Sequence, residues 1–276
     1  MLHSLSFVED PSRILRALRF ERRFGFAIGR HTLNLVRNAV KLDLVGRLPK
    51  TRLFNELALI LEEEEPVGIL RRLGELGVAP SIHPKISLDK GQVAVLDETS
   101  EVLVWFSLLF LEEKAERWGV LFLALLDPLI PDEAKKLAAD MGAGRHLREW
   151  VRIAKDEAGQ VMFRLCSSRV ISRKIVYDLL STLPNEVILY IMAKSKSPEI
   201  KRYISLYFTQ LKNVRPLITG QDLQNLGYQP GPIYRKILDD VLEQKFAGEL
   251  KTKAAEMSYV LAHFPKKGQA PESAGH

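Results

Sequence analysis

Carboxylates and arginines gather near the start of the chain, in an order that could face an anion. Glu9 and Asp10 come first, and the basic residues that follow at helical spacing are Arg13, Arg16, Arg19 and Arg23. A stripe of guanidinium groups on one side of a helix suits an anionic partner. The competing interpretation is an ordinary surface helix. Asp10 would then only cap it, and Glu9 and Arg13 would form an ion pair worth about 0.3–0.5 kcal/mol.

A helix must carry these side chains. Asp10 is a capping residue type, Pro11 suits a first helical position, and Gly25 suits a helix end. Apolar residues recur on one side, while the arginines form a stripe on another. The pattern predicts a helix over residues 11–24 with a core side and a side that faces an anion.

The segment Glu9-Asp10-x-x-Arg13, continued by Arg16-Ala17-x-Arg19-Phe20 and Gly25-Phe26, resembles the nucleotide-selecting motif of bacterial tRNA nucleotidyltransferases (CCA-adding enzymes) and their poly(A) polymerase relatives. The resemblance implies that Asp10 and Arg13 read the base of the substrates ATP or CTP. It implies that Glu9 holds Arg13 and that Arg16 belongs to the same nucleotide-binding group. The remaining arginines of the stripe, Arg19 and Arg23, are expected to contact RNA.

A second segment, Arg52-Leu53-Phe54-Asn55-Glu56-Leu57, resembles the next motif of that family, which lies on a helix of the neck. Thr51 stands where the family usually has glutamate, so that carboxylate is missing. Arg52 and Glu56 fall on one side of a helix, and the leucines fall on another. We therefore expect Arg52 and Glu56 to act as a structural brace in the neck.

A third segment, residues 218–232, resembles the signature that begins the tail of the same family. Its residues predict a short helix that begins at Thr219 or Asp222 and ends at Gly227, before Pro230-Gly231-Pro232 turns the chain into another helix. By resemblance, this region contacts RNA at Gly220, Pro230 and Gly231.

The carboxylates that nucleotidyl transfer requires are not found in the sequence. The family holds Mg²⁺ with an Asp-x-Asp pair after a glycine-rich loop, and this chain has neither. We expect no catalytic and no metal-binding residue here, with Mg²⁺ acting only through a head domain that the chain lacks. In a complete protein, a 3′-hydroxyl would attack the nucleotide α-phosphate and release pyrophosphate. The chain alone should be inactive. We expect it to be a fragment, or a sequence whose gene start is placed too late; a natural protein without a head domain is less favoured.

Charge points to a polyanionic partner, since the 276 residues carry a net charge of +6 and a pI near 9.3. A second basic segment contains Lys194, Lys196, Lys201 and Arg202, interleaved with Tyr203, Tyr207 and Phe208. These rings either stack on bases beside a phosphate backbone or form the core side of a helix whose lysines face water. The acidic run 62–65 is interpreted as a solvated helix end, and the lone Cys166 as a small core residue.

Apolar residues recur every three or four positions almost throughout, which predicts an all-α, elongated chain of neck, body and tail. The expected regions are 1–90 for neck and base recognition, 91–210 for the body, 211–264 for the tail and 265–276 as disordered. The function implied is the nucleotide-selecting, RNA-binding part of an enzyme that adds C or A to tRNA 3′ ends. Alternatives are a stand-alone RNA-binding helical protein or part of a poly(A) polymerase. Expected partners are RNA, tRNA in particular, and a nucleoside triphosphate, in the cytoplasm and without a membrane.

Overall fold

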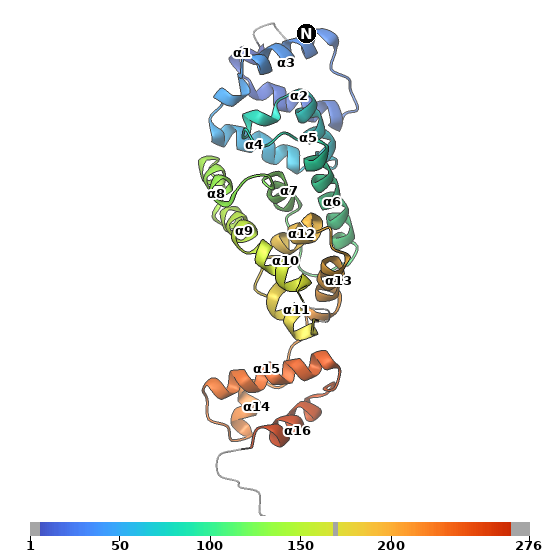
Figure 1. Ribbon diagram of the computed structural model, residues 1–276, viewed down its shortest axis with the longest axis vertical. Coiled ribbons are helices and arrows are strands. Elements are labelled where there is room, and N and C mark those ends of the chain that lie inside the picture. The colour runs from blue at the N-terminus through green and yellow to red at the C-terminus, as the bar shows by residue number, and fades with distance from the viewer. Residues whose placement is uncertain (1–5, 168–170, 266–276) are drawn as a thin grey trace, which may run out of the picture. The chain divides into compact units, whose positions relative to one another are not determined.

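The computed structural model describes residues 6–167 and 171–265, and every regular element in these ranges is a helix (Figure 1). The predicted all-α class is confirmed. The chain divides into two compact units, residues 1–167 with 183–201 and residues 168–182 with 202–276. The finer division into neck, body and tail stays a prediction. The segment expected to be disordered, 265–276, lies outside the described residues except for Pro265.

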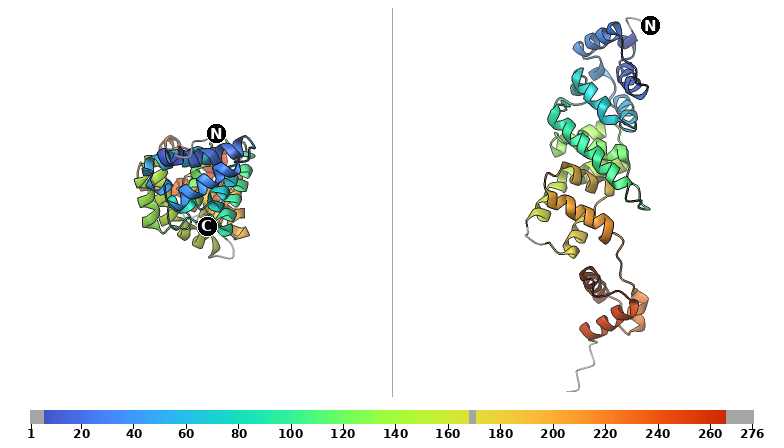
Figure 2. Two further views of the ribbon diagram at one scale, coloured as in Figure 1. Left: turned by 90° about the horizontal axis from the view of Figure 1, so that it is seen from above. Right: turned by 90° about the vertical axis from the view of Figure 1, so that its right-hand side faces the viewer.

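The first part of unit 1 is built around the arginine-bearing helix. Its helices are α1 (Ser6–Glu9), α2 (Ser12–Arg23), α3 (Arg30–Lys41), α4 (Lys50–Leu61) and α5 (Pro66–Glu75), with short turns η1 (Val45–Arg47) and η2 (Ala79–Ser81). Helix α2 packs against both α4 and α5 (Figure 2). Ile14, Leu15 and Leu18 are fully buried, as their spacing predicts. Burial of this apolar stripe fixes which way the arginines of α2 point.

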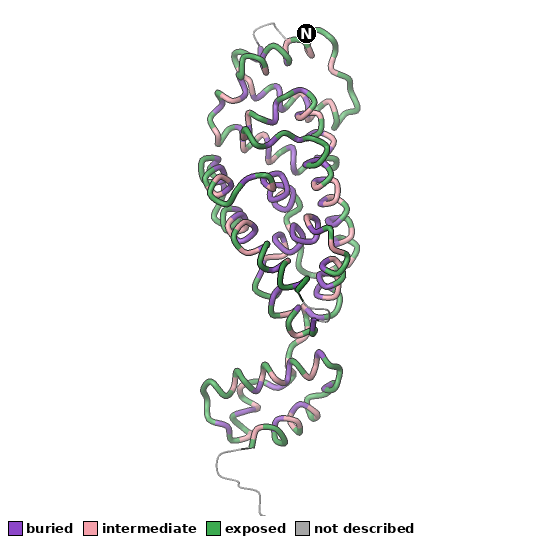
Figure 3. Tube along the Cα trace, viewed as in Figure 1, coloured by how far each residue is buried: buried purple, intermediate pink, exposed green. Residues whose placement is uncertain are grey.

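The rest of unit 1 surrounds two almost wholly buried helices. These are α7 (Arg117–Leu125) and α12 (Asn185–Lys194), which pack against each other and against α6 (Lys90–Ser107), as the purple segments of Figure 3 show. The unit also contains α8 (Pro131–Asp140), α9 (Arg145–Asp156), α10 (Ala158–Cys166) and the beginning of α13 (Pro198–Leu206). An apolar helix with residues buried on all sides belongs in the centre of a bundle.

Unit 2 contains α11 (Arg173–Leu180), the end of α13, a π-helical turn η3 (Tyr207–Leu211), α14 (Gly220–Asn225), α15 (Pro232–Ala247) and α16 (Lys253–His263). Thr219 caps α14, and the carboxylate of Asp222 accepts in return from the backbone N–H of Thr219 at 2.8 Å. Gly227 ends this segment with a φ of 86°, and Pro232 opens α15. The predicted helix, turn and helix are confirmed, with Thr219 rather than Asp222 at the start.

A buried glutamate in unit 2 ties α16 to α15 and to the segment that precedes α14. The side chain of Glu256 on α16 is fully buried and accepts from the backbone N–H groups of Leu217 and Ile218 at 2.7 and 2.9 Å. Its other oxygen accepts from the ammonium of Lys245 on α15 at 2.6 Å. Three donors therefore satisfy a charge that would otherwise be costly to bury.

Two interpretations of side chains need correction. Tyr203, Tyr207 and Phe208 are buried, so they form the core side of their helix and cannot stack on a base. Cys166 is exposed rather than part of the core.

Among the described residues no single helix has the length and apolarity to cross a membrane. One bent pair, α11 with α12, meets those criteria, although α12 is a buried core helix of unit 1.

Candidate functional site

Asp10 lies between α1 and α2, where its carboxylate is held by neighbours on both oxygens. Oδ1 accepts from the hydroxyl and the backbone N–H of Ser12 at 2.6 and 3.1 Å, and Oδ2 accepts from Nη2 of Arg52 on α4 at 2.8 Å. Partial burial raises the pKa of this carboxyl. Hydrogen bonds from Ser12 and the charges of Arg52 and Arg13 outweigh that effect, so the pKa of Asp10 lies below its usual value. Asp10 is therefore an ionised, oriented acceptor at neutral pH.

Arg13 is half-exposed and lies beside Asp10, with 3.9 Å between its Nε and Oδ2 of the carboxylate. Its Nη1 donates to the hydroxyl of buried Ser6 at 2.5 Å and lies 3.8 Å from the carboxylate of Glu9. Ser6 rather than Glu9 thus makes the closer contact. Arg16, one turn further along α2, is exposed and pairs with no carboxylate among the described residues. The structure thus brings Glu9, Asp10 and Arg13 together.

The expected brace between Arg52 and Glu56 has a different set of contacts. Arg52 donates to Asp10 and to the hydroxyl of Ser12, at 2.8 and 3.3 Å. Glu56 has a buried oxygen, Oε2, that has no hydrogen-bond partner in the described part of the chain. Arg52 therefore joins α4 to the start of α2, and the role of Glu56 stays a prediction.

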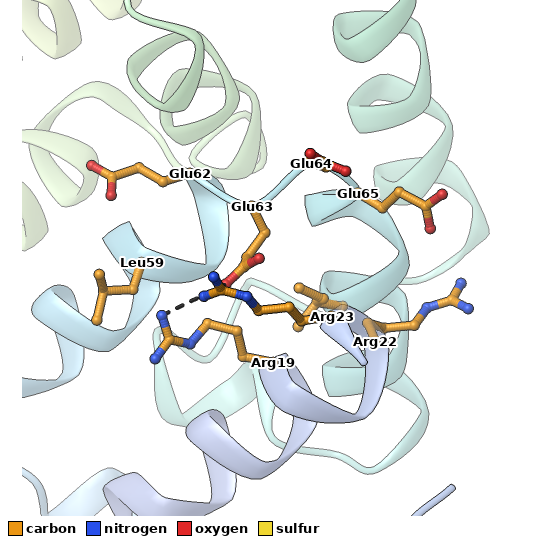
Figure 4. A pocket seen from close by; sticks show the side chains of 9 residues that line it. Arg19, Arg22, Arg23, Leu59, Glu62, Glu63, Glu64 and Glu65 are labelled. Atoms are coloured by element: carbon orange, nitrogen blue, oxygen red, sulfur yellow. Dashed lines mark ion pairs between the residues drawn. The ribbon is translucent and has the colours of Figure 1, made fainter. Parts of the chain in front are cut away.

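Arg19 and Arg23 turn toward an acidic segment instead of extending freely into water. Both guanidinium groups lie near the carboxylate of Glu63, at 3.7 and 3.6 Å, in a pocket of about 660 Å³ (Figure 4). Arg19 is almost fully buried, and its Nε has no hydrogen-bond partner among the described residues. The acidic run 62–65 is thus more than a solvated helix end, since Glu63 pairs with two arginines.

The basic residues near α12 and α13 differ in whether a carboxylate already pairs with them. Lys194 pairs with Asp127 at 2.7 Å, and Lys201 pairs with Glu98 on α6. Lys196 is exposed. In unit 2, exposed Arg202 lies over the ring of Tyr203. Lys196 and Arg202 can therefore meet a phosphate without first giving up a carboxylate.

Packing does not require the glycine of the tail signature. A side chain on Gly220, the first residue of α14, would have its Cβ 3.6 Å from the ring of Tyr234 on α15, which is an ordinary van der Waals contact. Pro230 and Gly231 form an exposed turn before α15. Contact of these residues with RNA stays a prediction.

No group of three or more His, Cys, Asp or Glu in the described residues could hold a metal ion. The residues described therefore do not fit a magnesium site of the kind that nucleotidyl transfer uses. Sequence reasoning missed Ser6, Ser12 and Glu63. Ser12 follows Asp10 at the spacing of a local Asx turn, a signal that could have been read, whereas Ser6 and Glu63 meet their partners only in the fold.

Comparison with known proteins shows which proteins the chain and its fold are similar to. No protein-family model matches the chain. An A-adding tRNA nucleotidyltransferase of Geobacter sulfurreducens is 47% identical over 262 residues, which are 93% of this chain and 30% of the relative. The Thermotoga maritima CCA-adding enzyme, solved in complex with tRNA, matches with a TM-score of 0.79 and 29% identity over 95% of this chain and 63% of that one.

Two further solved CCA-adding enzymes, one with CTP and one with ATP, match with TM-scores of 0.76 and 0.75 at 28% and 29% identity. They cover 96% and 94% of this chain, and it covers 63% and 62% of theirs. The chain thus has the helical fold of tRNA-processing enzymes. It is a homologue of the A-adding and CCA-adding tRNA nucleotidyltransferases, and this similarity confirms the resemblance seen in the motifs. The chain spans less than two thirds of the length of those relatives.

Proposed function

We propose that this chain is the nucleotide-selecting and RNA-binding portion of a template-independent nucleotidyltransferase that adds C or A to tRNA 3′ ends. The observation that carries the proposal is the pairing of Asp10, an ionised acceptor fixed on both oxygens, with the donor Arg13 beside it. Support comes from relatives described as A-adding enzymes and from similar structures solved with tRNA, CTP and ATP.

Adenine and cytosine share a feature that such a pair can recognise. Both carry an exocyclic amine next to a ring nitrogen acceptor, whereas guanine and uracil have a carbonyl oxygen in place of that amine. Asp10 would accept from the amine, and Arg13 would donate to the ring nitrogen. A carbonyl facing the Asp10 carboxylate would leave two acceptors together without a proton. The chain's own residues would therefore admit A and C and reject G and U.

In this proposal, Asp10 and Arg13 bind and orient the base and take no part in the transfer itself. Ser12 and Arg52 keep the carboxylate in place, and Ser6 keeps the guanidinium in place. A base that enters between fixed groups loses little free energy to their reorganisation. No step of the transfer is derived through a metal, since the described residues do not supply its ligands.

The RNA partner in this proposal is tRNA, held through exposed cations such as Lys196 and Arg202, each within its own unit. The setting is the cytoplasm, where tRNA is processed in bacteria such as those of the relatives named above. A stand-alone RNA-binding protein is the second candidate, favoured by the exposed arginine Arg16, which pairs with no described carboxylate.

Nucleotide selection in a graft tests the proposal. The chain replaces the homologous part of the Geobacter sulfurreducens enzyme, and kcat/KM is measured for ATP, CTP, GTP and UTP with a tRNA primer. We expect Asp10→Asn to reduce discrimination against GTP and UTP by roughly 5- to 150-fold, the factor carried by one good base contact. Asp140→Asn, at the exposed end of α8, is the matched control.

The outcomes separate the two candidates. Loss of discrimination in Asp10→Asn, with tRNA affinity unchanged, supports base selection. Unchanged discrimination together with weaker tRNA binding would favour the stand-alone RNA binder and remove the proposal. An inactive graft is resolved by measuring ATP and GTP binding to it directly, where the same preference and the same loss are expected.

A further inference from the structure

Three phenylalanine rings form an exposed ladder at the end of α2. Phe20, Phe24 and Phe26 are 37%, 55% and 69% exposed, and consecutive ring centroids are 5.7 Å apart in both steps. Water-exposed aromatic rings of this size are unfavourable unless something covers them. The ladder lies at the opposite end of α2 from Arg13, about 16 Å away along the helix axis.

Two local features hold the three rings next to one another. Gly25, with a φ of 65°, ends the helix and turns Phe26 toward Phe24, a conformation that a larger residue adopts only at a cost. Glu21 then accepts from the backbone N–H of Ile28 at 3.1 Å and pairs with Arg72 of α5 at 3.3 Å. The loop that carries Phe26 is therefore fixed at both ends.

Arginines lie directly beside the rings. Arg19 lies over the ring of Phe20 at 5.1 Å and Arg23 over the ring of Phe24 at 5.8 Å, and both also lie near the carboxylate of Glu63. Arg22 lines the same pocket as the acidic run 62–65, so a phosphate has to compete with glutamates there. Arg30, four residues after Phe26, does not line that pocket and pairs with no carboxylate in the described ranges.

We propose that this ladder, made of Phe20, Phe24 and Phe26, is a stacking platform for the unpaired bases of a single-stranded RNA. Flat rings with cations beside them suit a strand whose bases have open π-faces and whose backbone is anionic. This surface is separate from the pair that reads the nucleotide, so the inference goes beyond the proposed function and does not require it.

The alternative occupant is an apolar protein surface, such as a part of a longer protein like the relatives described above. Such a cover would bury the rings equally well, but an apolar surface without carboxylates would take the neighbouring arginine charges out of water without pairing them. Phosphate groups pair with those charges, so charge complementarity favours RNA.

Substitutions that keep apolar bulk but remove the aromatic ring distinguish the two. The whole chain is titrated into a labelled single-stranded oligoadenylate of about twelve nucleotides, within the usual site size, and into an RNA duplex of equal charge. We expect Phe24→Leu and Phe26→Leu each to weaken single-strand binding by roughly 5- to 150-fold, with duplex binding almost unchanged. Phe24→Tyr should retain binding. Phe163→Leu is the matched control, since Phe163 on α10 is 74% exposed and lies outside the ladder.

Each result counts for or against the platform. Equal affinity of the Leu variants and the parent for the single strand would overturn the proposal and indicate a protein cover. Equal losses on single strand and duplex would also overturn it, because that pattern reports charge alone. Circular dichroism of each variant separates misfolding from lost stacking. Nucleotide discrimination by the graft is measured in a separate assay, so failure of the platform and failure of base selection are distinguished.

Discussion

Removing the buried carboxylate of Glu256 should destabilise unit 2 more than any surface substitution there. In Glu256→Ala, the ammonium of Lys245 and the backbone N–H groups of Leu217 and Ile218 lose their acceptor together. Loss of one member of a buried pair costs about 3–5 kcal/mol, because the partner charge stays buried without compensation. Lys245 is only 12% exposed, so water cannot replace the lost contact without local rearrangement.

Hydrogen exchange is the suitable assay, because the chain has two compact units and a single unfolding midpoint would mix them. The amides of Leu217 and Ile218 are expected to exchange at least about 100-fold faster in Glu256→Ala, the factor that corresponds to roughly 3 kcal/mol. Glu256→Gln keeps one acceptor oxygen and should fall between the variant and the parent. Glu243→Gln, exposed on α15, is the matched control. Parent-like exchange at both amides in Glu256→Ala would refute the reasoning.

Two further predictions concern charge. Lys253 and Thr219 donate to the Asp222 carboxylate and lower its pKa from 3.8 to about 2. The stabilisation that this carboxylate gives α14 is therefore fully present above pH 3.8 and is lost as the pH falls through about 2. NMR titration of the Asp222 carboxyl checks the value, and a midpoint near 3.8 would contradict it. Glu63→Gln should release Arg19 and Arg23 and strengthen RNA binding about 2- to 5-fold at low salt, more than Glu64→Gln does. Equal effects of the two variants in an RNA titration would show that only net charge matters.

Local signals in the sequence were sufficient for several elements. Gly25 and Gly227 end helical segments, Thr219 caps α14 and Pro232 opens α15, because capping and turn preferences act between residues close in the chain. The core side of α2 followed from its spacing for the same reason.

Contacts between distant residues could not be predicted in this way. Arg52 has a carboxylate four residues away in Glu56, yet it donates to Asp10, 42 positions earlier in the chain. The packing of α2 on α4 decides that choice.

The same limit applies to aromatic rings near basic residues. Tyr203, Tyr207 and Phe208 have the spacing of a stacking surface and are buried. Phe26, which the sequence marked only as part of the first motif, and its neighbour Phe24 are exposed. Spacing gives the face of a helix, and only the neighbouring helices decide whether water reaches it.

The double anchoring of the loop after α2 has a kinetic consequence. Since Gly25 and the contacts of Glu21 already hold Phe26 in one position, an incoming strand meets an ordered ring and gives up little chain entropy on contact. Association should then be governed by charge and diffusion, and the identity of the ring should appear in how long the complex survives. Cutting the tether between Glu21 and Ile28 would instead release Phe26 from that position and slow productive encounters, although all three aromatic side chains are retained.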